Sequence, residues 1–311
     1  MEPDYIVVGA GAAGCVLADR LSADGRSTVM VLEAGGSDRR IMTRIPAGFY
    51  YLLRDPGVDW GYRTAPEPGL DGRRLPYPRG KILGGSGTIN GLWQSRGLPL
   101  DYDLWAETAG PEWSYAGMLP YFEKSEAYVH GGPGRGTHGP IAVCKSEVHP
   151  LTETFFEGGR KLQLPFIEDY NATPGIGLAR VQQTRRGRTR ETASTGYLSR
   201  ARARKNVSVV SKTTVLRLLI EGSRVTGIEI RRADGSLDRI RAGREVILAA
   251  GTINSPHLLH LSGIGPAEAL SKAGIEPRLD RPGVGANLHD HYNVRIVARI
   301  ADRSSLNLTS R

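Results

Sequence analysis

Apolar residues near the N-terminus follow first a strand pattern and then a helical one. The continuous apolar run Tyr5–Val8 predicts a buried strand, and the stretch from Cys15 to Leu21 has its apolar positions at helical spacing. A second apolar run, from Thr28 to Leu32, predicts another buried strand. A strand, a helix and a strand within about 30 residues predict a βαβ unit at the start of an α/β domain.

Further along the chain, the pattern predicts one long helix, two antiparallel strands and one more βα step. Residues 101–126 predict the helix. Residues 207–219 and 225–231 alternate between apolar and polar positions, and the turn sequence EGSR joins them. Residues 245–249 form an apolar run that leads into a glycine turn at Gly251. This order predicts a strand that feeds a turn and then a helix.

The last of these helices is predicted to begin at Pro256, with Ser255 as its N-cap. Residues 34–80 are rich in Gly, Pro, Arg and Trp and have no clear period, which predicts a long surface excursion. Together the patterns predict an α/β fold: a doubly wound, Rossmann-like sheet with an inserted β-meander.

The first turn carries a glycine motif that points to a ligand. Gly9, Gly11 and Gly14 form G-x-G-x-x-G between the first strand and the first helix. In this context the glycines permit the turn, let backbone approach a pyrophosphate, and let helix and strand pack closely. Glu33 ends the second strand, where an acid accepts a hydrogen bond from a ribose hydroxyl. The spacing therefore predicts a dinucleotide site.

Composition limits the class of protein without contradicting this site. The chain has 311 residues, of which 40 are glycine and two are cysteine, Cys15 and Cys144. Two distant cysteines argue against a disulfide framework and are typical of a reducing compartment. Glu2 and Asp4 stand where a signal peptide would be basic, and no apolar run reaches the roughly 18 residues of a membrane span. We expect a cytoplasmic protein with no membrane span.

The formal charge of +9 is concentrated in one segment. Residues 180–205 hold nine basic side chains against Glu191 alone. A nucleic-acid surface is one interpretation. The segment has a single aromatic residue, Tyr197, and therefore offers no series of stacking platforms for a single strand. The favoured interpretation is a solvated basic face, and no nucleic-acid partner is expected.

No residue pattern predicts a catalytic nucleophile, a general base or a metal site. The sequence around Ser86 lacks the final glycine of a hydrolase nucleophile motif, and no strand leads directly into it. His289 and His291 flank Asp290, but adjacent residues seldom converge on one ion. We therefore assign no catalytic residue and no metal ligand.

Motifs along the whole chain resemble those of the glucose–methanol–choline (GMC) oxidoreductases, most closely the choline-dehydrogenase-like members. The resemblance is carried in order by VVGAGAAGCVLA, DWGYRTAPEPGLDGR, YPRGKILGGSGTIN, GRTRETASTGYL, VILAAGTINSPHLLHLSGIG and PGVGANLHDH. It implies that the dinucleotide is FAD. It also implies an oxidoreductase that acts on the CH–OH group of a small-molecule alcohol and transfers a hydride to flavin N5. The electron acceptor is left open.

The resemblance carries cofactor roles onto the first loop. Gly9, Gly11 and Gly14 would hold the pyrophosphate, and Glu33 would bind the adenosine ribose. Some members attach their flavin through a histidine that directly precedes the loop asparagine. Ile89 stands there in this chain, so the FAD is expected to be held non-covalently.

Roles are also implied for later positions. The backbone of Ile82 and Gly84, with Asn90 and Gly91, would line the flavin and the pyrophosphate. Val215 would touch the adenine end.

The resemblance also implies a division of labour within a longer protein. In the family, a histidine near the C-terminus takes the hydroxyl proton, and none of the seven histidines here lies in a matching motif. We expect residues 1–300 to form the FAD-binding domain, with 155–200 contributing to the substrate side. We expect 301–311 to begin a truncated substrate domain. A flavin-binding fragment without turnover is the alternative, and a basic nucleic-acid-binding protein is the remote one.

Overall fold

The computed structural model describes residues 2–291 and 296–297, and it divides into two compact units. The first unit runs to Leu92 and resumes over Arg185–Leu288, and the second is built on Trp93–Thr184. The predicted start of a substrate domain, 301–311, lies outside the described residues.

A parallel sheet of four short strands forms the centre of the first unit. Its strand order is β11-β1-β2-β7. The registers Val8↔Leu32 and Val8↔Leu248 align the carboxyl ends of the three adjacent strands β1, β2 and β11. The chain segments that leave these strands therefore meet at one edge of the sheet. The strands are β1 (Tyr5–Val8), β2 (Val29–Leu32), β7 (Val207–Val210) and β11 (Glu245–Leu248).

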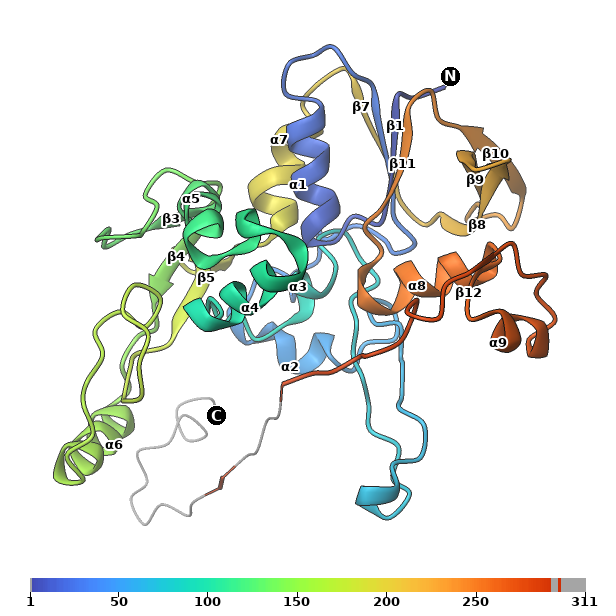
Figure 1. The fold of residues 1–311 in the computed structure, drawn as a ribbon. Coiled ribbons are helices and arrows are strands. Elements are labelled where there is room, and N and C mark those ends of the chain that lie inside the picture. Colours follow the sequence, from blue (N-terminus) through green and yellow to red (C-terminus); the bar gives the residue numbers. More distant parts are fainter. Residues whose placement is uncertain (1, 292–295, 298–311) are drawn as a thin grey trace. The chain divides into compact units, whose positions relative to one another are not determined.

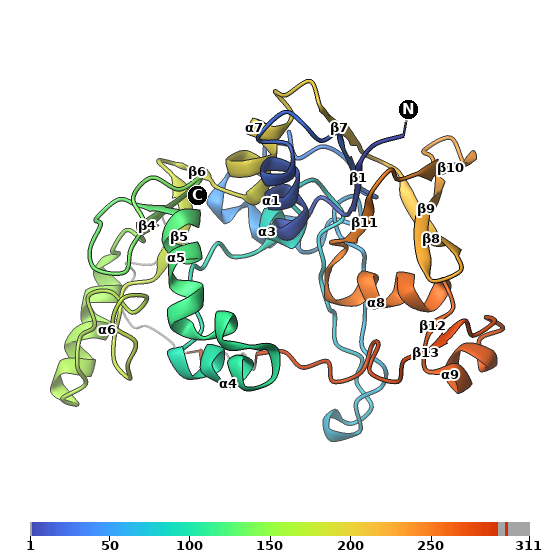
Figure 2. The same ribbon diagram turned by 45° about the horizontal axis from the view of Figure 1, so that its top comes forward.

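Different elements cover the two faces of this sheet. Helix α1 (Ala12–Leu21) covers one face, and an antiparallel meander covers the other (Figures 1 and 2). The side chains of Ile6, Val8 and Leu32 pack with those of Ile228 and others in one buried apolar cluster. The meander strands are β8 (Thr214–Glu221), β9 (Arg224–Arg231) and β10 (Leu237–Arg241).

The rest of the first unit consists of a long arm and of short elements. The arm leaves the sheet after β2 and returns as a loose ladder, with bridges Asp59↔Gly80, Arg63↔Pro76 and Glu67↔Arg73 (blue to cyan in Figure 1). The other elements are η1 (Pro46–Gly48), α2 (Phe49–Leu52), η2 (Pro68–Leu70), α3 (Ser86–Ile89), β6 (Thr189–Arg190), the π-turn η4 (Ser194–Leu198), α7 (Ser199–Ala201), α8 (Gly251–Leu261), β12 (Ile264–Gly265), α9 (Ala267–Lys272) and β13 (Leu279–Asp280).

The second unit combines helices with a small sheet. A buried charge network holds it together: Glu126 accepts hydrogen bonds from Arg96 at 2.6 Å and from Arg135 at 2.7 Å. Strand β3 pairs with β4 in parallel, and β4 pairs with β5 antiparallel. The elements are α4 (Pro99–Ala109), η3 (Pro111–Trp113), α5 (Tyr115–Ser125), β3 (Glu126–Tyr128), β4 (Ile141–Lys145), α6 (Pro150–Lys161) and β5 (Gln182–Arg186), which continues into the first unit.

The structure confirms the predicted fold class, a Rossmann-like α/β domain with an inserted meander, and corrects three elements. The helix predicted over 101–126 is two helices, because Gly110 adopts φ +111° and Pro111 follows it. Residues 207–210 form the parallel strand β7 beside β2 rather than a meander strand. Helix α8 begins at Gly251, so Ser255 and Pro256 lie inside it and do not start it.

Candidate dinucleotide-binding cleft

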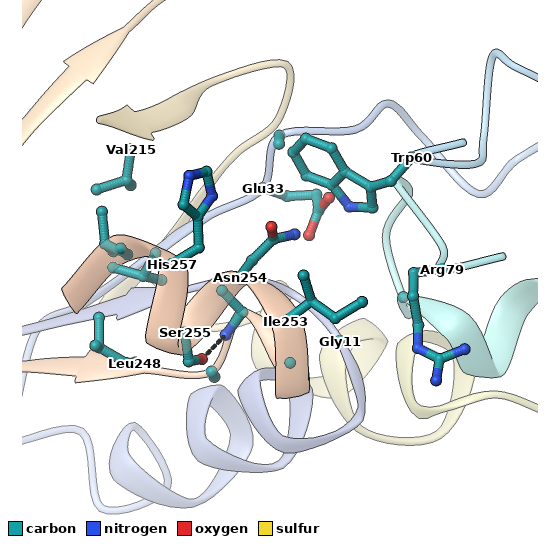
Figure 3. A pocket seen from close by; sticks show the side chains of 18 of the residues that line it. Gly11, Glu33, Trp60, Arg79, Val215, Leu248, Ile253, Asn254, Ser255 and His257 are labelled. Atoms are coloured by element: carbon teal, nitrogen blue, oxygen red, sulfur yellow. Dashed lines mark hydrogen bonds between the residues drawn. The ribbon is translucent and has the colours of Figure 1, made fainter. Parts of the chain in front are cut away.

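A cavity of about 850 Å³ opens at the carboxyl ends of β1, β2 and β11, and all of its lining residues belong to the first unit. This volume is in the range of cofactor sites. Figure 3 shows Glu33, Trp60 and Asn254 in the middle of the cleft, with Val215 and His257 to one side and Arg79 to the other. In open parallel sheets, ligands bind at this edge.

The three glycines of the first loop, Gly9, Gly11 and Gly14, differ in how closely other atoms approach them. At Gly9 the backbone has φ +101°, and a Cβ atom would lie 2.6 Å from the carbonyl oxygen of Ala249. At Gly14 a Cβ atom would lie 1.9 Å from the carbonyl oxygen of Gly9. At Gly11, which is the N-cap of α1, φ is −74° and the nearest atom to a Cβ would be 3.9 Å away. Folding therefore requires glycine at Gly9 and Gly14 but not at Gly11.

Glu33 is a buried carboxylate that joins two backbone segments at the floor of the cleft through hydrogen bonds. Only 6% of the residue is exposed. One carboxylate oxygen accepts a hydrogen bond from the Ala10 N–H at 2.9 Å, and the other accepts one from the Gly35 N–H at 2.8 Å. Burial raises the pKa of Glu33, while these two N–H groups and the positive charge of Lys81 oppose the rise. Each oxygen retains a second lone pair for a ligand hydroxyl.

The second glycine loop, residues 80–91, packs directly on the first. The Gly84 N–H donates to the Ala10 carbonyl oxygen at 2.7 Å. A Cβ atom at Gly85 would lie 2.8 Å from the Cα atom of Gly11. A Cβ atom at Gly35 would lie 1.9 Å from the carbonyl oxygen of Lys81. Backbone therefore meets backbone at these contacts, and side chains there would separate the two loops.

Arg190 holds the far end of the second loop. Its guanidinium donates to the carbonyl oxygens of Asn90 at 2.7 Å, Pro46 at 3.2 Å and Gly87 at 3.3 Å. The residue is only 3% exposed, and burial lowers its pKa to about 10. Its bonds are to carbonyl groups, so Arg190 fixes the loop through several hydrogen bonds rather than through an ion pair.

Aromatic residues of the arm reach the cleft, and sequence reasoning missed them. The Tyr62 hydroxyl donates to Asn254 Oδ1 of α8 at 2.6 Å. The Trp60 and Tyr62 rings stack with centroids 5.9 Å apart, and the Lys81 ammonium lies 4.8 Å from the Trp60 ring centroid. Both rings line the cleft. Their signal was the DWGY stretch, a closely spaced aromatic pair inside the excursion over 34–80.

A family model described as GMC oxidoreductase matches residues 3–293. The chain belongs to this family. It is 43% identical over 295 residues to an oxygen-dependent choline dehydrogenase of Photobacterium profundum, an alignment that covers 94% of this chain and 52% of that relative. The chain spans about half the length of the curated relatives it matches.

Solved structures support the same GMC fold. A pyridoxine 4-oxidase from Mesorbium loti superposes with a TM-score of 0.86 at 34% identity, covering 90% of this chain and 56% of that one. An FAD-dependent oxidoreductase from Chaetomium thermophilum superposes with a TM-score of 0.84 at 31% identity, covering 91% and 51%.

The cleft brings together four of the nine residues predicted to bind the cofactor: Gly9, Gly11, Glu33 and Val215. The other five do not line it. Gly14 packs behind the first loop, and Ile82 is 1% exposed in a separate apolar cluster. From the second loop, the residues that line the cleft are Gly80, Gly85, Ser86 and Gly87, whereas Gly84, Asn90 and Gly91 do not line it. Contact of all nine with FAD remains a prediction.

Residues 2–291 and 296–297 contain no group of three His, Cys, Asp or Glu side chains that could hold a metal ion. Within the same residues, every helix is too short or too polar to cross a bilayer.

Proposed function

We propose that this chain is the FAD-binding part of an oxidoreductase that acts on the CH–OH group of a small alcohol. The cofactor is FAD, in keeping with membership of the GMC family and with the FAD-dependent structural neighbour. The choline dehydrogenase relatives make a choline-type alcohol the favoured substrate. Because the chain spans about half of those relatives, turnover is proposed for the longer protein.

The observation that carries the proposal is the open surrounding of Gly11. Its φ of −74° suits any residue, and a Cβ atom there would make only an ordinary van der Waals contact, 3.9 Å from the carbonyl oxygen of Ala249. Nothing in the folded chain therefore requires glycine at this position. A diphosphate lying against the backbone would require it, because a side chain would hold the phosphates away from the N–H groups of helix α1.

The surrounding residues fit the other parts of FAD. The N-terminus of α1 offers free N–H groups and a positive dipole end to the phosphates, and no acidic side chain lies in its first turn. Glu33 retains lone pairs for a ribose hydroxyl. Val215 and Leu248 supply apolar surface on one side of the cleft. When bound, the flavin supplies the hydride acceptor of the reaction.

We propose that FAD is bound non-covalently and therefore reversibly. Ile89, at the position where some members carry an attachment histidine, is 1% exposed and has no nucleophilic atom. Burial raises the pKa of the Cys15 thiol to about 12, so that thiol is protonated at neutral pH and is a poor nucleophile. Denaturing the loaded protein in acid should release the yellow colour into the supernatant.

A flavin-binding chain without turnover is the second candidate for the isolated 311 residues, because the site contains no assigned general base. The nucleic-acid alternative is disfavoured by what the basic segment does in the fold. Arg190 is buried on carbonyl groups, Arg204 pairs with the buried Asp19 at 2.8 Å, and Arg186 pairs with Glu191 at 2.6 Å. These guanidinium groups are engaged with partners of the fold, although Arg186 is itself exposed.

The test is a titration of the purified chain with FAD, followed by flavin fluorescence and by the visible spectrum. The proposal predicts saturable binding at one site, no comparable binding of NAD, and no alcohol oxidation above a trace. A folded chain that fails to bind FAD would contradict the cofactor assignment. Rapid oxidation of choline by the 311-residue chain would contradict the assignment of the base to the longer protein.

A further inference from the structure

A second cavity, of about 790 Å³, lies in the first unit outside the dinucleotide cleft. Its walls come from the loop after β2, from Thr88 of α3, and from the segment between Arg186 and Ala203. The same short helix separates the two cavities: Ser86 and Gly87 line the cleft, whereas Thr88 lines the second cavity. The function proposed above leaves this cavity without a role.

The floor of the second cavity is unusually polar for a buried surface. Six polar or charged residues that line it are at most 6% exposed. Buried polar groups cost free energy unless they are hydrogen-bonded, so such a floor needs partners. The six residues are Thr43, Thr88, Arg190, Glu191, Thr192 and Ser194.

Two of these floor residues have unused hydrogen-bonding groups. The Nε–H of Arg190 is buried and has no partner among the residues that the structure describes. Within the same described residues, the Ser194 hydroxyl makes no hydrogen bond, although it is 5% exposed. By contrast, the Thr88 hydroxyl donates to the Leu83 carbonyl oxygen at 2.8 Å. Arg190 and Ser194 thus line the cavity and each carry a hydrogen-bonding group that no described residue satisfies.

The rim of the cavity adds positive charge. Arg39, Arg44 and Arg202 line it, are exposed, and have no carboxylate partner within the described part of the chain. Arg186 also lines it and pairs with Glu191 at 2.6 Å. In all, five guanidinium groups face two carboxylates, those of Asp38 and Glu191. The surplus of three positive charges favours an anion.

We propose that this second cavity binds a small phosphate-bearing anion. Guanidinium groups match phosphate oxygens in paired hydrogen bonds, and hydroxyl groups donate to the remaining oxygens. The cavity supplies both kinds of donor. A phosphate group presents three or more acceptor oxygens to a ring of donors of this kind, whereas a carboxylate presents two. The buried Arg190 and Ser194 form the floor of the site, and Arg44 and Arg202 form its entrance.

The test uses inorganic phosphate as the probe and the 311-residue chain saturated with FAD, so that the N-terminus of α1 is already occupied. Phosphate is titrated at constant ionic strength in chloride, and binding is followed by calorimetry and by the unfolding temperature. We expect saturable binding. Arg44→Gln and Arg202→Gln should each weaken it about tenfold, because each removes a charge-assisted hydrogen bond while leaving an exposed position intact.

Arg188→Gln is the matched control. Arg188 belongs to the same basic segment and is exposed, but it does not line the cavity, so this variant should bind phosphate within about twofold of the parent. Equal losses for Arg188→Gln and Arg44→Gln would show a general charge effect and overturn the proposal. A linear, unsaturable response to phosphate would overturn it too. Arginine-dependent binding of an acidic peptide, without binding of phosphate, would assign the cavity to a protein segment instead.

Discussion

The two glycine-rich loops of the first unit reach the same cleft by different means. In the first loop, Gly9–Gly14, the motif, the strand before it and the helix after it are contiguous, and Gly14 packs on Gly9 within the loop, although Gly9 also packs on Ala249. In the second loop, residues 80–91, the contacts are with distant segments: Gly85 packs on Gly11, Lys81 packs against Gly35, and Asn90 accepts a hydrogen bond from Arg190. The motif of the first loop is therefore contiguous with the strand and helix that support it. The second loop depends on contacts with segments that are distant in the sequence.

The largest effect is expected where a new methyl group would meet backbone. Gly14→Ala tests the first loop and Gly35→Ala the second, since each Cβ atom would lie 1.9 Å from a carbonyl oxygen. Each change should lower the free energy of unfolding by about 3 kcal/mol, because the backbone itself must shift. Urea denaturation measures both. Gly87→Ala is the control, since no atom lies within 4 Å of its Cβ position.

A difference between the two variants would sharpen the comparison. Gly14→Ala should disturb both loops, because the second loop rests on the first. Gly35→Ala should disturb the second loop alone, which amide hydrogen exchange resolves segment by segment. Exchange that rises equally in both loops for Gly35→Ala would show that they form one unit.

Arg190→Gln should have the next largest effect and should confine it to the second loop. Its loss leaves the carbonyl oxygens of Asn90, Gly87 and Pro46 without their donor, at a cost of about 2–3 kcal/mol. FAD affinity should fall as Ser86 and Gly87 move. Arg190→Lys keeps the charge and one donor position and should recover part of the loss. Unchanged hydrogen exchange over residues 80–91 in Arg190→Gln would contradict the role given to Arg190.

Glu33→Gln probes the carboxylate that joins the first loop to the start of the arm. A Gln side chain can accept only one of the two N–H bonds from Ala10 and Gly35, so the free energy of unfolding should fall by about 1–2 kcal/mol at neutral pH. FAD affinity should fall about tenfold, through loss of the charged acceptor for ribose.

The pH dependence of this variant has a definite sign. Burial raises the pKa of Glu33 in the folded chain above its ordinary value of 4.5, so the folded state keeps the proton to higher pH than the unfolded state. The stability of the parent relative to Glu33→Gln should therefore decline as pH rises from about 4.5 through the raised pKa, and level off above it. A relative stability that increases with pH would contradict the assignment.

The sequence predicted elements whose signals are contiguous along the chain and missed features that depend on contacts between distant segments. The β1–α1–β2 unit and the meander turn were confirmed, because strand, turn and helix signals are contiguous there. Strand β7 was misassigned because the alternation in Val207–Val210 also suits an antiparallel strand, and only its pairing with β2 decides the matter. The break at Gly110 was readable, since a glycine followed by proline ends helices.

The cofactor residues divide in the same way. Gly9, Gly11 and Glu33 were predicted from motif spacing and line the cleft. Within the second loop, the sequence offered glycines at several positions without a register, so it did not show that Gly85 lines the cleft whereas Gly84 does not. Trp60 reaches the cleft because of the path that the arm takes through space. The DWGY stretch showed an aromatic pair but not that path.

Gly11→Ala tests the central claim most directly, because it is the change that the fold should tolerate and the cofactor should not. The Cβ atom would make only an ordinary contact with the Ala249 carbonyl oxygen, so the free energy of unfolding of the apoprotein should fall by less than about 1 kcal/mol, the difference between Gly and Ala at an N-cap. FAD titration of this variant beside the parent chain is the measurement. We predict a dissociation constant at least about tenfold higher for Gly11→Ala, since the methyl group holds the diphosphate off the backbone. An unchanged dissociation constant, in a variant that is fully folded, would contradict the placement of the FAD diphosphate at this loop.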